Sequence, residues 1–115
     1  MTGDYPRRGE IWFADLNPTR GHEQQGTRPV LVLSIDSFNS GPAELVSILP
    51  VTSTVRAIAS HIEVRPPEGG LRARSSILAD QVRTITRERF VRRSGAVSPT
   101  TLRRVEEVVR ILLGL

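Results

Sequence analysis

The feature that most constrains the fold is the run "PVLVLSI" at residues 29–35, where four aliphatic residues follow one another from Val30 to Leu33. Successive side chains of a strand point to opposite faces, so both faces of this segment are apolar. A strand of this kind is typically buried from two sides. We therefore expect a sheet built around this segment, with apolar residues covering both of its faces.

Four further segments have the composition of short strands, because they are rich in Val, Ile, Leu or aromatic residues and are bounded by Gly, Pro, Asn or Asp. They occupy residues 9–16, 45–51, 61–64 and 76–85. In the first of them, alternation places Ile11 and Phe13 on one face and Trp12 and Ala14 on the other. A short helical turn is expected from Thr86 and a brief strand at residues 95–97. The long polar connection covers residues 17–27.

The segment "SPTTLRRVEEVVRILLGL" predicts an amphipathic helix, since its apolar residues recur at spacings of three and four while Arg and Glu fill the other side. Ser98 is the expected N-cap, Pro99 the first helical residue and Gly114 the stop. Packing on the sheet would account for the whole apolar stripe, which comprises Leu102, Val105, Val108, Val109, Leu112 and Leu113. With so little helix to cover it, the antiparallel sheet is expected to curl into a small barrel, which makes the fold mainly β (α+β).

Composition limits the remaining possibilities. A chain of 115 residues with 38% hydrophobic and 24% charged residues predicts a single domain over residues 1–115. No apolar run approaches the roughly 20 residues that cross a bilayer, and the N-terminus has no apolar signal segment, so a cytoplasmic location without membrane contact is expected. The absence of cysteine and the presence of only two histidines lead us to expect neither disulfide, metal nor other cofactor.

The net charge of +4 comes from arginine alone, because none of the 16 basic residues is lysine. Two explanations are open. The choice of arginine can reflect codon bias in the source genome. Alternatively, the planar guanidinium binds phosphate in a bidentate manner and therefore suits a nucleic-acid surface.

The order of motifs resembles one family. "RGEIWFADLNPTRGHEQQGTRPVLVLS" is followed by "ILPVTST", "ILADQVRTI" and the C-terminal helix. This series resembles the MazF/PemK toxins of type II toxin–antitoxin systems along nearly the whole chain. The family pattern is met almost throughout, although His22 stands where the family usually has serine.

The resemblance implies an SH3-like barrel that forms a homodimer and acts as an endoribonuclease. Such an enzyme, called an mRNA interferase, cuts single-stranded RNA at specific sequences without a metal and leaves a 2′,3′-cyclic phosphate and a 5′-hydroxyl. The implied partners are mRNA and a cognate MazE-like antitoxin, whose acidic segment would block the RNA groove. Cleavage would inhibit translation and growth.

The resemblance also implies three catalytic residues: Arg28, Thr52 and Glu23. Arg28 can donate several N–H bonds to a phosphorane, a role that we favour over general acid. The Thr52 hydroxyl can donate to a phosphate oxygen, with Ser53 and Thr54 as alternatives. Glu23 would act as base on the 2′-hydroxyl or orient Arg28.

Further residues are candidates for RNA contacts. Polar residues suited to base edges are Asn17, Gln24, Gln25, Thr27 and Gln81, and arginines suited to phosphates are Arg20, Arg56, Arg83 and Arg87. Ser53 and Thr54 are further candidates for RNA contacts. The aromatic residues Trp12 and Phe13 could stack on bases, but we expect them in the core. His22 is expected to be a surface residue without a role, although it could share proton transfer, and His61 is expected to be structural.

Two other functions are compatible with this fold. One is a gyrase poison of the CcdB type, which relies on a tryptophan near the C-terminus, whereas this chain ends "ILLGL". The other is an inactive relative that only binds RNA or an antitoxin. The combination of Glu23, Arg28 and Thr52 favours the ribonuclease.

Overall fold

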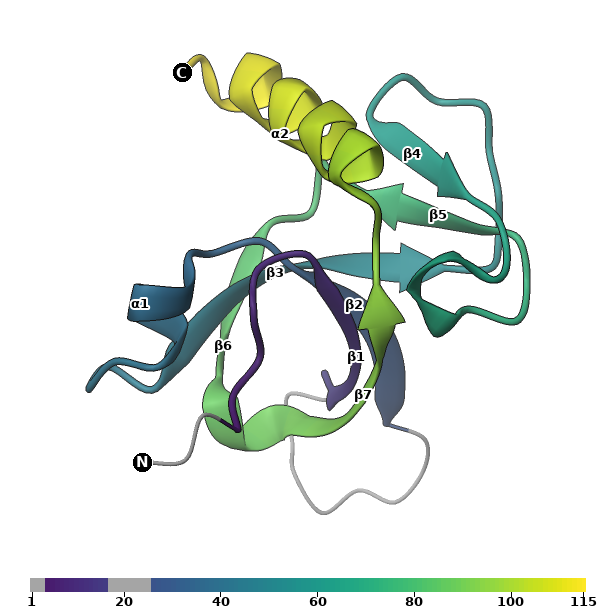
Figure 1. Cartoon of the computed structure of the whole chain (residues 1–115). Coiled ribbons are helices and arrows are strands. Elements are labelled where there is room, and N and C mark those ends of the chain that lie inside the picture. Colours follow the sequence, from purple (N-terminus) through teal and green to yellow (C-terminus); the bar gives the residue numbers. More distant parts are fainter. Residues whose placement is uncertain (1–3, 17–25) are drawn as a thin grey trace.

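The computed structural model describes residues 4–16 and 26–115, and Figure 1 shows their arrangement. The strands are β1 (Glu10–Asp15), β2 (Thr27–Val32), β3 (Leu45–Thr52), β4 (His61–Val64), β5 (Ser75–Leu78), β6 (Arg83–Thr86) and β7 (Phe90–Ala96). The helices are α1 (Asp36–Asn39) and α2 (Pro99–Leu113), and the short 3₁₀ turns are η1 (Glu68–Gly70) and η2 (Arg87–Arg89).

The described strands form an antiparallel sheet in the order β4-β5-β3-β2-β1-β7, with β6 also paired to β3. Strand β3 is long enough to serve two neighbours on one edge: its beginning pairs with β6 and its end with β5. Figure 1 shows that the sheet is strongly curved and that α2 lies across one end of it. The prediction of a mainly β fold with a curled antiparallel sheet and a C-terminal helix is confirmed.

Strand β2 is central and buried from both sides, as its apolar sequence predicts. Val30 and Val32 belong to the inner core, a cluster completed by Ala14, Val46, Ile48 and Ile85. The intervening Leu31 belongs to the helix-side core, whose other members include Ile11, Leu49, Ile62, Ile77 and Val105. All three β2 residues have no exposed surface. Because its side chains alternate between two faces, β2 contributes residues to both cores.

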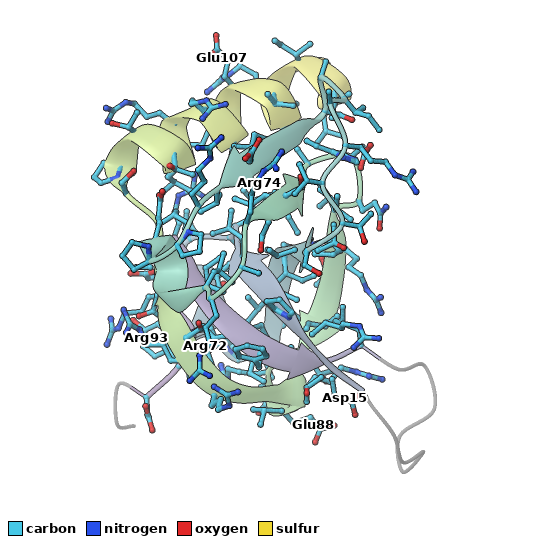
Figure 2. All side chains as sticks on the ribbon, turned by 90° about the vertical axis from the view of Figure 1, so that its right-hand side faces the viewer. Asp15, Arg72, Arg74, Glu88, Arg93 and Glu107 are labelled. Atoms are coloured by element: carbon cyan, nitrogen blue, oxygen red, sulfur yellow. The ribbon has the colours of Figure 1, made fainter. Side chains whose placement is uncertain are left out.

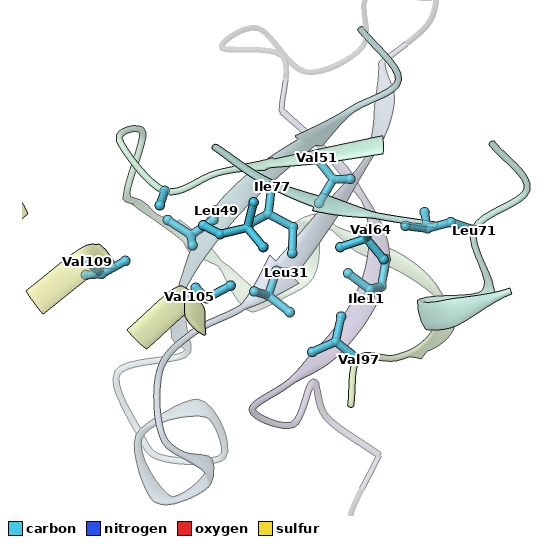
Figure 3. Packing of buried hydrophobic residues seen from close by; sticks show 12 residues of the cluster. Ile11, Leu31, Leu49, Val51, Val64, Leu71, Ile77, Val97, Val105 and Val109 are labelled. Atoms are coloured by element: carbon cyan, nitrogen blue, oxygen red, sulfur yellow. The ribbon is translucent and has the colours of Figure 1, made fainter. Parts of the chain in front are cut away.

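Helix α2 begins and ends as the sequence predicts. Ser98 Oγ accepts a hydrogen bond from the backbone N–H of Thr101 at 3.1 Å, Pro99 opens the helix, and Gly114 ends it in the left-handed conformation. Val105 and Val109 pack into the helix-side core beside Leu31 and Leu49 (Figure 3).

The expectation that packing accounts for the whole apolar stripe of α2 is wrong. Leu112 and Leu113 are 48% and 57% exposed, and Ile111 and Leu115 are exposed as well. The last turn of the helix extends past the sheet, so the single chain leaves an apolar helix end in contact with solvent.

Residues 76–85 form two strands rather than the single strand expected. A turn closed by the hydrogen bond from Gln81 N to Leu78 O at 3.1 Å separates β5 from β6. The two strands pair with opposite ends of β3, so the chain must change direction between them.

Two other elements differ from expectation. Helix α1 was not expected; its Asn39 is fully buried and donates to Pro6 O at 3.0 Å, a contact with a residue far away in the sequence. Strand β7 begins at Phe90 rather than at residue 95, and the helical turn expected from Thr86 is present as η2. In the part of the chain that the structure describes, no helix is long and apolar enough to span a membrane.

Candidate functional site

A groove of about 1050 Å³ crosses the sheet at the ends of several strands. Its lining comes from β1, the start of β2, the end of β3, the segment between η1 and β5, β5 itself, the start of β6 and the middle of β7. Segments far apart in the sequence therefore share one surface, and rigid strands hold most of its side chains.

Arg28 and Thr52 both line this groove, Arg28 at the start of β2 and Thr52 at the end of β3. The β2–β3 register ends with Val30 paired to Pro50, so Arg28 and Thr52 each lie two residues beyond the last pair of this ladder. Since adjacent strands lie about 5 Å apart, both side chains can reach one phosphate.

The immediate contacts of these two side chains leave them able to bind a ligand. Arg28 is exposed, and its described contact is a long one, from Nη1 to Thr27 O at 3.5 Å. Thr52 Oγ1 accepts from the backbone N–H of Thr54 at 3.1 Å, which orients the hydroxyl. Because that bond uses an acceptor lone pair, the hydroxyl hydrogen can still be donated.

The groove is strongly cationic. Its described lining contains five arginines and neither Asp nor Glu; the arginines are Arg28, Arg72, Arg83, Arg92 and Arg93. Concave surfaces lined by one sign of charge concentrate ligands of the opposite sign. The described groove is therefore suited to an anionic ligand.

Sequence reasoning missed Arg72, Arg92 and Arg93. Figure 2 shows Arg72 and Arg93 on the same face of the molecule, although they lie in η1–β5 and β7. The signal available in the sequence was the pair of arginines in "VRRSG" and the arginine after "GGL", but their common position depends on contacts between distant segments.

One of those contacts is a close approach of two backbones. Gly70 has φ +73°, and a Cβ there would lie 2.1 Å from Ser94 O. Ser94 Oγ donates to Gly69 O at 2.9 Å. Glycine at position 70 thus allows the turn that carries Arg72 to dock against β7.

Glu10 holds another part of the groove wall in place. Its carboxylate accepts hydrogen bonds at 2.8 Å from Arg7 N, Trp12 Nε1 and Arg93 Nε. Burial raises the pKa of Glu10, but the bonds from Trp12, Arg7 and Arg93 and the charge of Arg93 together hold this pKa below its usual value. The carboxylate is therefore ionised at neutral pH and fixes Arg93 at the groove.

The two aromatic residues of β1 have different surroundings. Trp12 packs against the inner core and meets Phe90 edge to face, as expected of a core residue. Phe13 belongs to neither core and lines the groove, with the Arg92 guanidinium 4.2 Å from its ring centroid. The expectation that Phe13 is a core residue is wrong: Phe13 follows the expected alternation of β1, two residues after Ile11 of the helix-side core, but it lines the groove instead of that core.

Other predicted RNA contacts divide into two groups. Thr27, Ser53, Gln81 and Arg83 line the groove, whereas Thr54 and Arg56 do not. Arg87 does not line the groove; its Nη1 donates to Asn39 O at 2.7 Å and to Gly41 O at 3.2 Å, so it supports the end of α1.

Six of the sequence candidates lie outside the described residues: Asn17, Arg20, His22, Glu23, Gln24 and Gln25. The other histidine, His61, lies with Nε2 3.5 Å from Asp80 Oδ2, and its side chain is only 11% exposed. No group of three or more His, Cys, Asp or Glu residues within residues 4–16 and 26–115 could hold a metal ion.

The fold and the groove together define a small curved-sheet protein with an arginine-lined site for an anionic ligand. Residues 7–113 match the family described as the PemK-like, MazF-like toxin of type II toxin-antitoxin system. The chain belongs to this family.

Two relatives have similar length and extend over almost the whole chain. Endoribonuclease MazF9 of Mycobacterium tuberculosis (strain ATCC 25618 / H37Rv) is 34% identical over 114 residues, covering 95% of this chain and 97% of that protein. Endoribonuclease EndoA of Bacillus subtilis (strain 168) is 33% identical over 110 residues, with 95% of each covered.

Solved structures agree with this assignment. MazF from Deinococcus radiodurans (Form-I) superposes with a TM-score of 0.80 at 29% identity, covering 96% of this chain and 98% of that one. A MazE-MazF structure (Form-II) from the same organism gives a TM-score of 0.82 at 28% identity, covering 96% and 97%.

Proposed function

We propose that this protein is the toxin of a type II toxin–antitoxin system and an endoribonuclease that cuts single-stranded RNA at specific sequences. The observation that carries the proposal is the groove with five arginines and, in its described lining, no acidic residue, where Arg28 and Thr52 lie on neighbouring strands. RNA presents a phosphate at every nucleotide, so it is a suitable ligand for such a groove. The names of the relatives MazF9 and EndoA support endoribonuclease activity.

The proposed reaction is attack of a ribose 2′-oxygen on the adjacent phosphorus. The bond from O2′ to phosphorus forms, the bond from phosphorus to O5′ breaks, and the products are a 2′,3′-cyclic phosphate and a 5′-hydroxyl. One proton leaves the 2′-hydroxyl and one is added to the departing O5′. Negative charge accumulates on the non-bridging oxygens in between.

Arg28 and Thr52 are suited to that charge. The guanidinium of Arg28 would donate charge-assisted hydrogen bonds to the non-bridging oxygens. The Thr52 hydroxyl, oriented by the amide of Thr54, would donate one more. Strand ends give both groups a fixed direction, and donors that are preorganised in this way stabilise a transition state more than a flexible ground state.

The general base and the remaining RNA contacts are proposed from the sequence and from the residues that line the groove. Glu23 would take the proton of the 2′-hydroxyl or orient Arg28. Thr27, Ser53, Gln81 and Arg83 line the groove and would contact the RNA there. The other proposed contacts are Thr54 and Arg56 and, from the connection between β1 and β2, Asn17, Arg20, Gln24 and Gln25.

Two protein partners complete the proposal. A MazE-like antitoxin would place an acidic segment in the same groove, since opposite charges make the two surfaces complementary; the Deinococcus radiodurans MazE-MazF structure supports an antitoxin partner. A second copy of the chain would form a homodimer, which is one way to cover the exposed apolar end of α2. The proposed substrate is mRNA, which places the activity in the cytoplasm.

The test is cleavage of a long single-stranded transcript by the purified protein in EDTA, with the 5′ ends of the fragments sequenced. We expect cuts at one short recurring sequence, and fragments that polynucleotide kinase labels without prior phosphatase treatment, because their 5′ ends are hydroxyls. Intact RNA together with inhibition of DNA gyrase would replace this proposal with a gyrase poison. Intact RNA and active gyrase, with antitoxin still bound, would indicate an inactive relative.

A further inference from the structure

Phe13 is the large aromatic side chain among the described residues of the groove. It belongs to neither hydrophobic core, although it neighbours the buried Ala14 in β1. An aromatic ring that lines a cationic groove instead of a core has surface available for a ligand. Its position therefore calls for an explanation other than packing.

Arg92 covers this ring. Phe13 and Arg92 are direct cross-strand partners of β1 and β7, and the guanidinium carbon lies over the ring, 4.2 Å from its centroid. Cation–π attraction at this distance holds the guanidinium over the ring. The Arg92 side chain is nevertheless exposed, so it remains accessible to a ligand.

The stacked pair lies beside the proposed catalytic residues. Phe13 is the cross-strand partner of Pro29, the residue next to Arg28, and Arg92 lies one strand further out in β7. Thr52, Arg28, Phe13 and Arg92 all line the same groove. A single RNA strand bound at Arg28 would have a neighbouring nucleotide at this pair.

We infer that Phe13 and Arg92 form a nucleobase-binding subsite, in which an unstacked base of single-stranded RNA lies flat on the guanidinium that Phe13 supports. This inference rests on the proposed function, which makes RNA the ligand of the groove. Stacking on aromatic rings and on arginine planes is the usual way in which unpaired bases are bound. The subsite binds the base, whereas the neighbouring Arg93, held by Glu10, is in place for a phosphate.

The substitution Arg92→Lys distinguishes base stacking from phosphate binding. It keeps the positive charge that a phosphate needs but lacks the plane on which a base stacks. Arg92→Lys and Phe13→Leu are therefore the informative variants. Phe13→Tyr keeps an aromatic ring and is the matched control, while Arg103→Lys, at an exposed position of α2, controls for the exchange of arginine itself.

The experiment uses RNA oligonucleotides that contain the mapped cleavage sequence, each with one base replaced by an abasic ribose. For the wild type, one abasic position near the cut should lower kcat/KM by about 5- to 100-fold. In Arg92→Lys and Phe13→Leu the intact RNA should be cut more slowly by a similar factor, and the abasic substitution at that position should have no further effect. Phe13→Tyr, which keeps an aromatic ring, should keep the loss of kcat/KM at that abasic position, and Arg103→Lys should retain the wild-type pattern.

If the abasic substitution lowers kcat/KM in Arg92→Lys and Phe13→Leu as much as in the wild type, the proposed subsite is refuted, while the proposed nuclease activity stands. If the wild type cuts no RNA, the proposed function fails separately. The subsite is then decided by fluorescence anisotropy with a short labelled oligoadenylate and its fully abasic counterpart. Weaker binding of the abasic strand by the wild type, and equal binding of both by Arg92→Lys, would support it; any other result would overturn it. Circular dichroism confirms that each variant is folded.

Discussion

Glu10→Gln tests how the groove wall is held, because the Glu10 carboxylate joins Arg93 of β7 to Trp12 of β1 and to the backbone of Arg7. Glutamine is nearly the same size and keeps one oxygen, so it can still accept from Trp12 and Arg7. Its NH₂ group would face Arg93 and cannot accept the third bond. The substitution therefore removes one ion pair and weakens two charge-assisted bonds.

The magnitude follows from these three contacts. Arg93 is 50% exposed, so its ion pair contributes less than about 1 kcal/mol. Each of the other two bonds loses the extra strength of an ionised acceptor, on the order of 0.5 kcal/mol. We expect Glu10→Gln to lower the free energy of unfolding at pH 7 by about 1–2 kcal/mol.

The pH dependence has a definite sign. Since the folded-state pKa of Glu10 is lowered, its contribution to stability is fully present above the unfolded pKa of about 4.3 and is lost as pH falls through the folded pKa. Glu68 and Glu63 also have lowered pKa values, so the wild type loses stability in acid from several groups. The difference between wild type and Glu10→Gln isolates Glu10.

Urea unfolding followed by the fluorescence of Trp12, the single tryptophan, provides the assay. The difference in unfolding free energy should shrink as pH is lowered from neutral to below the folded pKa of Glu10. The control is Glu107→Gln, at an exposed position of α2, which should change stability little at either pH. A difference that is the same at neutral and acidic pH would refute the assignment of Glu10 as an ionised anchor.

Three further predictions concern the groove. Gly70→Ala should lower the free energy of unfolding by more than the roughly 1–3 kcal/mol of a strained φ, because the added Cβ would meet Ser94 O. Gly114→Ala is the control, since Gly114 has a similar φ of +72° with open space around it, and equal losses in urea unfolding would contradict the close approach at Gly70. Thr52→Val should lower kcat for RNA cleavage more than it raises KM, and Thr52→Ser should restore kcat; an effect on KM alone would make Thr52 a binding residue. RNA affinity should fall as salt concentration rises, and five phosphate contacts would give a slope of log K against log[salt] of about −3.5. A flat response would favour codon bias as the reason for the arginines.

Much of the fold could be predicted from the sequence because the deciding signals are local. The two-sided apolar run of β2 and the capped, periodic α2 specify a central strand and a covering helix without knowledge of the rest of the chain. Prediction from the sequence failed where pairing with a distant segment of the chain decides the secondary structure. Residues 90–94 are largely polar and become a strand because β1 pairs with them, and residues 76–85 divide because β3 offers two places to pair.

The site shows the same division. The sequence indicated Arg28 and Thr52 through the family resemblance, and the structure brings both to one groove. It could not indicate Arg72, which reaches the groove through the contact of Gly70 with β7. Nor could it separate the role of Phe13 from that of Trp12, since the distant segments that surround each ring decide whether it packs on a core or lines the groove.

The central claim is that the cationic groove is an RNA-cleaving site. Its most direct test is the rate at which Arg28→Ala cuts an RNA that contains one copy of the cleavage sequence. Arg28 is exposed and makes one weak described contact, so its loss should leave the melting temperature nearly unchanged. The rate of cleavage in EDTA should fall by about 100-fold or more, as expected when a donor to the transition-state charge is removed. Arg103→Ala removes an exposed arginine of α2, outside the groove, and should cut at the wild-type rate. A folded Arg28→Ala protein that cuts RNA as fast as the wild type would contradict the account.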